Sequence, residues 1–216
     1  MITVVGLGAG GHAKVVIEIL CMGHDVEVMG LLDPKRELWG SKVVGVPVLG
    51  DDDMLAELHD QGVRHAFVGL GSIGDARPRT ALYAKARSHG FELVSAVHPQ
   101  AVVSPSAEVG HGPTIMAAAV VNAEARLGDN VIVNTGAVVE HDCVLAAHVH
   151  IATGARLASA VHVGEGAHVG VGASVRQGIR VGEHAIVGAG AAVVADVPDG
   201  VVVVGVPARV LRGAGA

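Results

Sequence analysis

The chain has 216 residues, of which half are hydrophobic and only 2% are aromatic, so any core must consist mostly of valine, isoleucine, leucine and alanine. The formal net charge is −6 and basic residues form no run, so a nucleic-acid-binding platform is not expected. No apolar run approaches the roughly 20 residues of a membrane-spanning helix, and the N-terminus lacks the basic start of a signal peptide. The two cysteines, Cys21 and Cys143, provide no disulfide framework, which favours a cytoplasmic location.

The first 98 residues alternate between strand-like and helix-like segments. Runs rich in β-branched residues predict strands at residues 2–5, 26–32, 64–70 and 91–97. Apolar residues at helical spacing predict helices at residues 12–22, 51–60 and 76–89, and residues 39–49 are expected to form a loop or a hairpin. Alternation of this kind is typical of parallel βαβ units, so residues 1–98 are expected to form a Rossmann-like α/β domain.

Residues 99–216 follow a different period. Every sixth residue from Val103 to Val193 is Val, Ile or Leu, without a slip in register. A second column, four residues after each of these, runs from Ala107 to Val197 and holds small or medium apolar residues. A period of six needs a chain that turns a corner after each hexad, and three faces make one coil of 18 residues. The pattern predicts an all-β parallel β-helix of about five coils stacked at strand spacing, roughly 4.8 Å.

The 18-residue coil indicates which histidines lie above one another. His150 and His168 share one column, and His148 and His184 share another with Gly166 between them. A stacked pair could hold a metal ion with a third ligand from another chain, which is the arrangement of the γ-class carbonic anhydrases and stands as one alternative.

His141 differs because an acidic residue lies on each side of it, Glu140 and Asp142. It occupies an outward position of its hexad, with Ala123 and Ser159 as its column neighbours. A carboxylate beside an imidazole orients the ring and favours its protonated form, which suits a general base. Cys143 falls in the small interior column, so we expect it to pack in the core rather than act as a nucleophile.

The N-terminal glycines match a second pattern. Gly6, Gly8 and Gly11 form G-x-G-x-x-G between a strand and a helix, and Asp33 ends the next strand, so an NAD-dependent oxidoreductase is another alternative. Two observations count against this alternative. About four strands are too few for a complete dinucleotide-binding fold, and hydride transfer does not require the β-helix that residues 99–216 are expected to form. The same loop can bind any nucleotide diphosphate at a helix N-terminus. A β-helix that is only a scaffold, as in ice-binding or filament-forming proteins, is a further alternative.

Three stretches together resemble one family: GAGGHAKVV (residues 8–16), VVEHDCVL (138–145) and GVPAR (205–209). They are similar to bacterial nucleotide-sugar acyltransferases related to sialic acid O-acetyltransferase, and most similar to those that N-acetylate nucleotide-linked 4-amino-4,6-dideoxy sugars. The resemblance spans both halves of the chain. It implies a left-handed β-helix and a homotrimer whose active sites lie between the β-helices of neighbouring chains. It also implies acetyl-CoA as co-substrate and no metal. GDP-perosamine is the first expected substrate and UDP-linked amino sugars are the second.

The resemblance also implies roles for particular residues. His141 corresponds to the general base and Asp142 to the acidic residue that tunes it. The acetyl-CoA groove would include His150, Val171 and Ala189. The nucleotide-sugar site would include Gly10, Gly11, His12, Asp33, Pro34 and Gly71. Gly10 stands where the family often has serine, which removes a hydroxyl contact, and Arg209 stands where it often has lysine, which keeps the charge.

Overall fold

A computed structural model of the chain describes residues 1–23 and 25–212. The chain divides into two compact units, each built from two stretches of sequence. Unit 1 comprises Met1–Gly71 and Pro78–Pro99, and unit 2 comprises Ser72–Arg77 and the residues from Gln100 onward. Among the described residues, no helix is long and apolar enough to cross a membrane.

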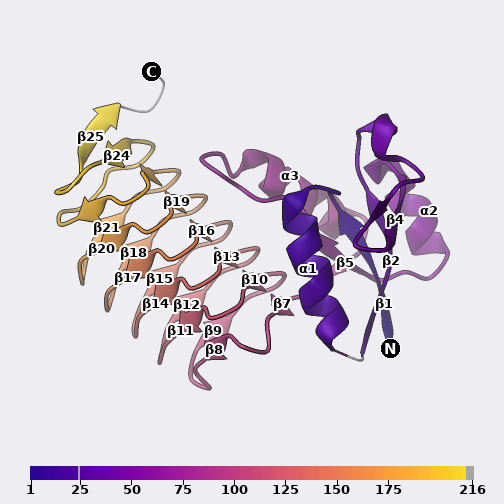
Figure 1. The fold of residues 1–216 in the computed structure, drawn as a ribbon, viewed down its shortest axis with the longest axis horizontal. Coiled ribbons are helices and arrows are strands. Elements are labelled where there is room, and N and C mark those ends of the chain that lie inside the picture. Colours follow the sequence, from indigo (N-terminus) through magenta and orange to yellow (C-terminus); the bar gives the residue numbers. More distant parts are fainter. Residues whose placement is uncertain (24, 213–216) are drawn as a thin grey trace. The chain divides into compact units, whose positions relative to one another are not determined.

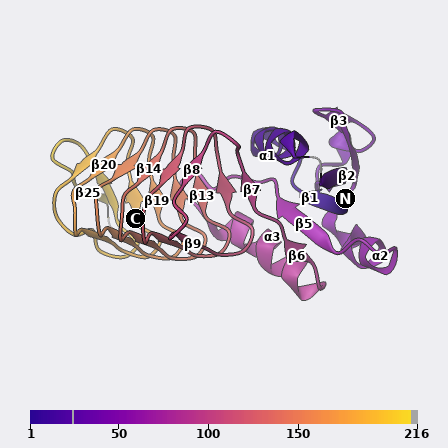
Figure 2. The same ribbon diagram turned by 90° about the horizontal axis from the view of Figure 1, so that it is seen from below.

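Unit 1 contains a sheet of six strands in the order β3-β4-β2-β1-β5-β6, parallel except where β3 pairs with β4. Figures 1 and 2 together label its strands. The strands are β1 (Ile2–Leu7), β2 (Val26–Leu32), β3 (Lys42–Val43), β4 (Val46–Gly50), β5 (His65–Val68) and β6 (Glu92–Leu93), followed by β7 (Ala96–Val97). The helices are α1 (Gly11–Met22), α2 (Leu55–Asp60) and α3 (Arg77–Ser88), with short 3₁₀ turns at Arg36–Leu38 and Asp52–Met54. The predicted α/β class is therefore confirmed.

The sheet has more strands than the predicted four, because residues 39–49 contain the hairpin β3–β4 and β4 then pairs with β2. The two residues that connect β3 to β4, Val44 and Gly45, have φ angles of +48° and +82°. Positive φ at both connecting residues is the geometry of the two-residue hairpin turns in which Asn-Gly is the preferred sequence. A valine at the first position does not indicate such a turn in the sequence. The segment predicted as one strand at 91–97 is divided into β6 and β7.

The strand order places β1 between β2 and β5, so the chain leaves β1 toward one side of the sheet and later returns on the other. In open parallel sheets this reversal is where ligands bind, beyond the carboxyl ends of the two central strands. The segments that follow β1 and β5, residues 8–11 and 69–71, therefore flank the expected ligand crevice of unit 1.

Unit 2 is a three-sided parallel β-helix whose strands stack as successive coils (Figures 1 and 2). Most strands pair with the strand 18 residues away, as in Val120 with Val138 and His150 with His168, whereas Ile186 of the last full coil pairs with Val202, 16 residues on. The β8 face consists of β8 (Val102–Val103), β11 (Val120–Val121), β14 (Val138–Val139), β17 (Arg156–Leu157), β20 (Ser174–Val175) and β23 (Ala192–Val193). The β9 face consists of β9 (Glu108–Val109), β12 (Arg126–Leu127), β15 (Val144–Leu145), β18 (His162–Val163) and β21 (Arg180–Val181). The β10 face contains β10 (Thr114–Ile115), β13 (Ile132–Val133), β16 (His150–Ile151), β19 (His168–Val169), β22 (Ile186–Val187), β24 (Val202–Val204) and the antiparallel β25 (Arg209–Arg212).

The two predicted hexad columns fill the interior of this β-helix. From Ile115 to Val193 the large column is buried, and the small column packs with it in a single core. Val103 is only partly buried and Val109 is 38% exposed, because they belong to the first coil and no coil covers them from below. The β-helix prediction is therefore confirmed.

The corners repeat with the same period of six. One residue in most corners has a positive φ, as in Gly136 (+65°), Asp142 (+61°) and His148 (+63°). The backbone N–H of such a residue donates to a carbonyl of the preceding coil, for example from Asp142 to Ala123 at 3.1 Å. Glycine adopts this conformation most easily, which explains why it is the commonest residue at these corner positions.

Candidate functional site

His141 lies in the turn between β14 and β15, at the edge where the β8 and β9 faces meet. Its side chain is 54% exposed, and Nδ1 is 2.6 Å from Oδ2 of Asp142. Nε2 is 2.8 Å from the hydroxyl of Ser159, one coil away. A carboxylate only accepts hydrogen bonds, so Nδ1 carries the proton and Nε2 keeps the lone pair that a base requires.

The backbone of Asp142 explains how its carboxylate reaches the ring. With φ at +61°, Asp142 adopts a left-handed conformation that aspartate tolerates better than most residues. The other acidic neighbour, Glu140, does not hydrogen-bond the imidazole: its Oε2 accepts from Nδ2 of Asn122 at 3.0 Å and from the His141 backbone at 3.3 Å. Of the two flanking carboxylates, Asp142 orients the ring and Glu140 braces the turn.

Cys143 follows this pair but faces the interior. Its thiol donates to the carbonyl of Ala158 at 3.2 Å, and burial raises its pKa. A buried thiol with a raised pKa carries little thiolate, which is the nucleophilic form.

His150 and His168 stack on the β10 face, and both are buried. Nδ1 of His150 is 3.0 Å from the carbonyl of Ser72, and Nε2 is 3.3 Å from Nδ2 of Asn134. The carbonyl accepts and the amide donates, so His150 is neutral with its proton on Nδ1. The two rings meet edge to face with centroids 4.9 Å apart. Ser72 belongs to the short stretch 72–77 of unit 2, which therefore lies against this histidine pair.

Burial lowers the pKa of His168, although a hydrogen bond with the Ser72 backbone acts in the opposite direction. The unfolded chain therefore binds this proton more readily than the folded one, and stability falls as pH decreases below about 6.5, the usual histidine value. We expect urea midpoints measured between pH 8 and pH 5 to fall less steeply in His168→Asn than in the native chain. His162→Asn, at an exposed position of β18, serves as the control. Equal slopes in all three proteins would contradict the prediction.

Val171 and Ala189 share one column at the edge between the β10 and β8 faces, where both are exposed. The carbonyl of Val171 accepts from Gly190 at 2.8 Å, so the two turns stack directly. His141 lies at a different edge, and His150 lies on the face opposite that edge. A single copy of unit 2 therefore does not bring the predicted base and the predicted acetyl-CoA residues together.

The predicted nucleotide-sugar residues lie at the carboxyl edge of the sheet in unit 1. The carboxylate of Asp33 accepts from the backbone of Ala9 at 2.9 Å, which ties the glycine loop to the end of β2. A Cβ on Gly71 would lie 3.8 Å from the Cβ of His12, so these two residues are neighbours. Pro34 follows Asp33 and is exposed. A buried arginine, Arg79, also reaches this edge, and nothing in the sequence distinguished it.

The glycines of this loop have two different uses. A Cβ on Gly6 would come 2.6 Å from Leu31, and Gly8 has a φ of +100°, so both are required by packing and backbone geometry. A Cβ on Gly10 or Gly11 would meet nothing within 4 Å. Gly10 is the N-cap residue of α1, so the open space beside Gly10 and Gly11 lies at the start of this helix.

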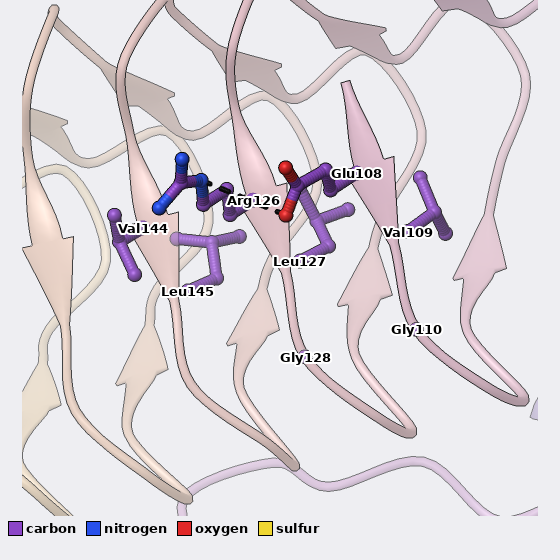
Figure 3. Close-up of a pocket in the computed structure, with 8 residues that line it drawn as sticks. All are labelled: Glu108, Val109, Gly110, Arg126, Leu127, Gly128, Val144 and Leu145. Carbon is purple, nitrogen blue, oxygen red and sulfur yellow. Dashed lines mark ion pairs between the residues drawn. The ribbon is translucent and has the colours of Figure 1, made fainter. Parts of the chain in front are cut away.

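A shallow groove lies on the β9 face, lined by residues of β9, β12 and β15 (Figure 3). Arg126 and Glu108 form an ion pair of 3.6 Å beside it. None of the predicted site residues lines this groove. In the part of the chain that the structure describes, no three His, Cys, Asp or Glu side chains gather to form a metal site.

Comparisons with known proteins place the whole chain in a family. The family model of the PglD N-terminal domain matches residues 3–86. PerB from Caulobacter crescentus, solved in complex with CoA and GDP-perosamine, is 49% identical over 97% of each chain with a TM-score of 0.89. The acetyltransferase domain of PglB from Neisseria gonorrhoeae, in complex with acetyl coenzyme A, is 40% identical over 97% of this chain and 98% of its own, with a TM-score of 0.86. A search among curated proteins finds no match.

These similarities extend over nearly the whole length of the chain and include both units and their order. They also establish the left-handed form of the β-helix. The chain belongs to the family of nucleotide-amino-sugar N-acetyltransferases that join a PglD-type N-terminal domain to a left-handed β-helix.

Proposed function

We propose that this protein transfers the acetyl group of acetyl-CoA to the 4-amino group of GDP-perosamine. The observation that carries the proposal is the 49% identity, over 97% of both chains, to a relative solved with CoA and GDP-perosamine bound. Two further structures of that relative contain H141N and H141A substitutions and also hold CoA and GDP-perosamine. His141 of this chain has the same residue number, and its environment suits a base.

In the proposed reaction, the lone pair of the neutral 4-amino nitrogen forms a bond to the thioester carbonyl carbon while Nε2 of His141 takes one proton from that nitrogen, directly or through one water. The carbon–sulfur bond then breaks, and the imidazolium returns this proton to the departing thiolate. The hydroxyl of Ser159 occupies the Nε2 lone pair at 2.8 Å and must rotate away as the amine enters. His150 already donates to Ser72, so stabilisation of the oxyanion is assigned to backbone N–H groups.

A homotrimer is part of the proposal. One chain holds His141 at the edge of the β8 and β9 faces and holds His150, Val171 and Ala189 elsewhere on the β-helix. A site that uses all four needs residues from two neighbouring copies, and a cyclic arrangement supplies this at each interface. The outward residues of the first β8-face strands, Val102, Val120 and Val138, are apolar, and Val102 is 61% exposed. A solution mass of three times the 21.7 kDa chain is expected.

Acetyl-CoA and nucleotide sugars are both present in the bacterial cytoplasm, and the two cysteines are free, so a cytoplasmic location is also proposed. The decisive experiment mixes the protein with acetyl-CoA and GDP-perosamine and follows thiol release, with the product identified by mass. UDP-linked 4-amino sugars are run in parallel. Release with GDP-perosamine alone supports the proposal, release only with a UDP sugar changes the substrate, and no release with any sugar rejects the transferase.

A further inference from the structure

Arg79 of α3 is buried inside unit 1, with 1% of its surface exposed. Its Nη1 donates to the carbonyls of Val68 at 2.9 Å and Leu70 at 2.6 Å. The same nitrogen is 3.4 Å from Nε2 of His12. Burial lowers the pKa of the guanidinium to about 9, so it remains charged at neutral pH. A buried cation is costly, and its hydrogen bonds to this edge of the sheet offset part of that cost.

The three acceptors lie in or directly beside the two segments that flank the ligand crevice, residues 8–11 and 69–71. Val68 ends β5 and Leu70 lies just beyond it, whereas His12 is in the first turn of α1, after β1. Arg79 therefore connects the ends of β1 and β5 at the point where the strand order reverses. It also places a fixed positive charge beside the first turn of α1, where the helix dipole already favours an anion.

The contact with His12 fixes the state of that ring. Guanidinium nitrogens only donate hydrogen bonds, so in this contact Nε2 of His12 accepts, sharing one of the two Nη1–H groups with a backbone carbonyl, and the ring proton lies on Nδ1. A histidine held in this way offers an N–H donor from Nδ1 at a constant orientation. Gly71, which follows Leu70, is next to the Cβ of His12 and completes the same edge.

From this geometry we infer that Arg79 is a positioning residue of the nucleotide-sugar site. It holds His12 as a neutral Nδ1–H donor and holds the segment after β5 against it, so that both meet the diphosphate or sugar oxygens of the ligand. This inference rests on the proposed function for the identity of the ligand. The tautomer of His12 does not depend on that function.

The first test is the ¹⁵N NMR signature of His12 in the native protein. We expect Nδ1 to be protonated and Nε2 to be bare, which is the reverse of the tautomer that free histidine prefers. In Arg79→Lys and Arg79→Met this preference is expected to weaken. A native His12 protonated at Nε2, or at both nitrogens, would overturn the inference whatever the enzyme binds.

The second test measures binding of GDP, with UDP in parallel, by calorimetry. Loss of a charge-assisted network predicts a Kd for GDP about 10-fold or more higher in Arg79→Met, with Arg79→Lys between it and the native protein. The KM for acetyl-CoA should stay unchanged, which a general loss of folding would not produce. Arg77→Met is the matched control, because Arg77 is on the same helix but exposed and paired with Asp75 at 2.8 Å.

The possible results separate the two proposals. The positioning role is rejected if Arg79→Lys and Arg79→Met both fold, bind GDP with native affinity and keep the native His12 tautomer. If the native protein binds neither GDP nor UDP, the proposed substrate is wrong, and the NMR measurement still decides whether Arg79 sets the state of His12.

Discussion

Substituting His141 with alanine is expected to lower kcat by about 10²-fold or more, the usual contribution of a general base. The reason is geometric: Asp142 binds Nδ1 at 2.6 Å and leaves Nε2 as the proton acceptor at an exposed edge of the β-helix. KM values for both substrates should change little, because the side chain acts on the proton and not on the bulk of either ligand. Steady-state thiol release under saturating substrate measures the effect.

Asp142→Asn is the companion variant. Asparagine tolerates the φ of +61° at this position and can still accept a hydrogen bond from Nδ1, so the turn should keep its shape while the charge is lost. We expect a smaller loss of kcat than in His141→Ala. An unchanged rate in His141→Ala would remove this imidazole from the mechanism, and a larger loss in Asp142→Asn would make the carboxylate the dominant group.

Gly128→Ala is expected to destabilise the β-helix by about 3 kcal/mol, at the upper end of the usual cost of overpacking. A Cβ at this position would lie 2.7 Å from the backbone nitrogen of Ala147 and 2.9 Å from the carbonyl carbon of Ala146, both in the next coil. Backbone atoms in a stacked coil cannot move aside as a flexible side chain can. The coils must therefore separate locally, which weakens hydrogen bonds such as that from Gly128 to Leu145 at 2.8 Å. Urea unfolding monitored by circular dichroism measures the change.

Gly154→Asn is the control for this prediction. Gly154 has a φ of +66°, which asparagine adopts readily, and a Cβ there meets nothing within 4 Å. Its unfolding midpoint should remain close to that of the native chain. A midpoint for Gly128→Ala equal to that of Gly154→Asn would mean that the coils accommodate the methyl group without separating.

The β-helix could be predicted because its core repeats in sequence. Each hexad supplies one large and one small interior residue, and the stacking of coils requires the same residue types every 18 positions. The sequence left residues 39–49 open between a loop and a hairpin, because the turn at Val44 and Gly45 depends on a positive φ at a valine. The stretch 72–77 was likewise assigned with its sequence neighbours, because nothing in its composition indicates that Ser72 contacts His150 and His168 of the β-helix.

The candidate site was predictable where its parts are close in sequence or one coil apart. Asp142 adjoins His141, and Ser159 is 18 residues beyond it, so both contacts follow from the repeat. Arg79 could not be found in this way. Arg77 and Arg79 are two positions apart in one helix, yet one is exposed and the other is buried. Only the three-dimensional packing of α3 distinguishes them.

The two-segment composition of each unit has a consequence for dissecting the protein. A fragment that begins at residue 100 would contain strands β8 to β25 but would lack Ser72, the hydrogen-bond acceptor of His150. The imidazoles of His150 and His168, which are buried in the intact chain, would then be exposed to water on the side that residues 72–77 cover. A recombinant β-helix prepared alone would therefore not reproduce the structure that these residues have in the enzyme. A chimera that exchanges N-terminal halves between relatives would need residues 72–77 and the C-terminal half from the same protein.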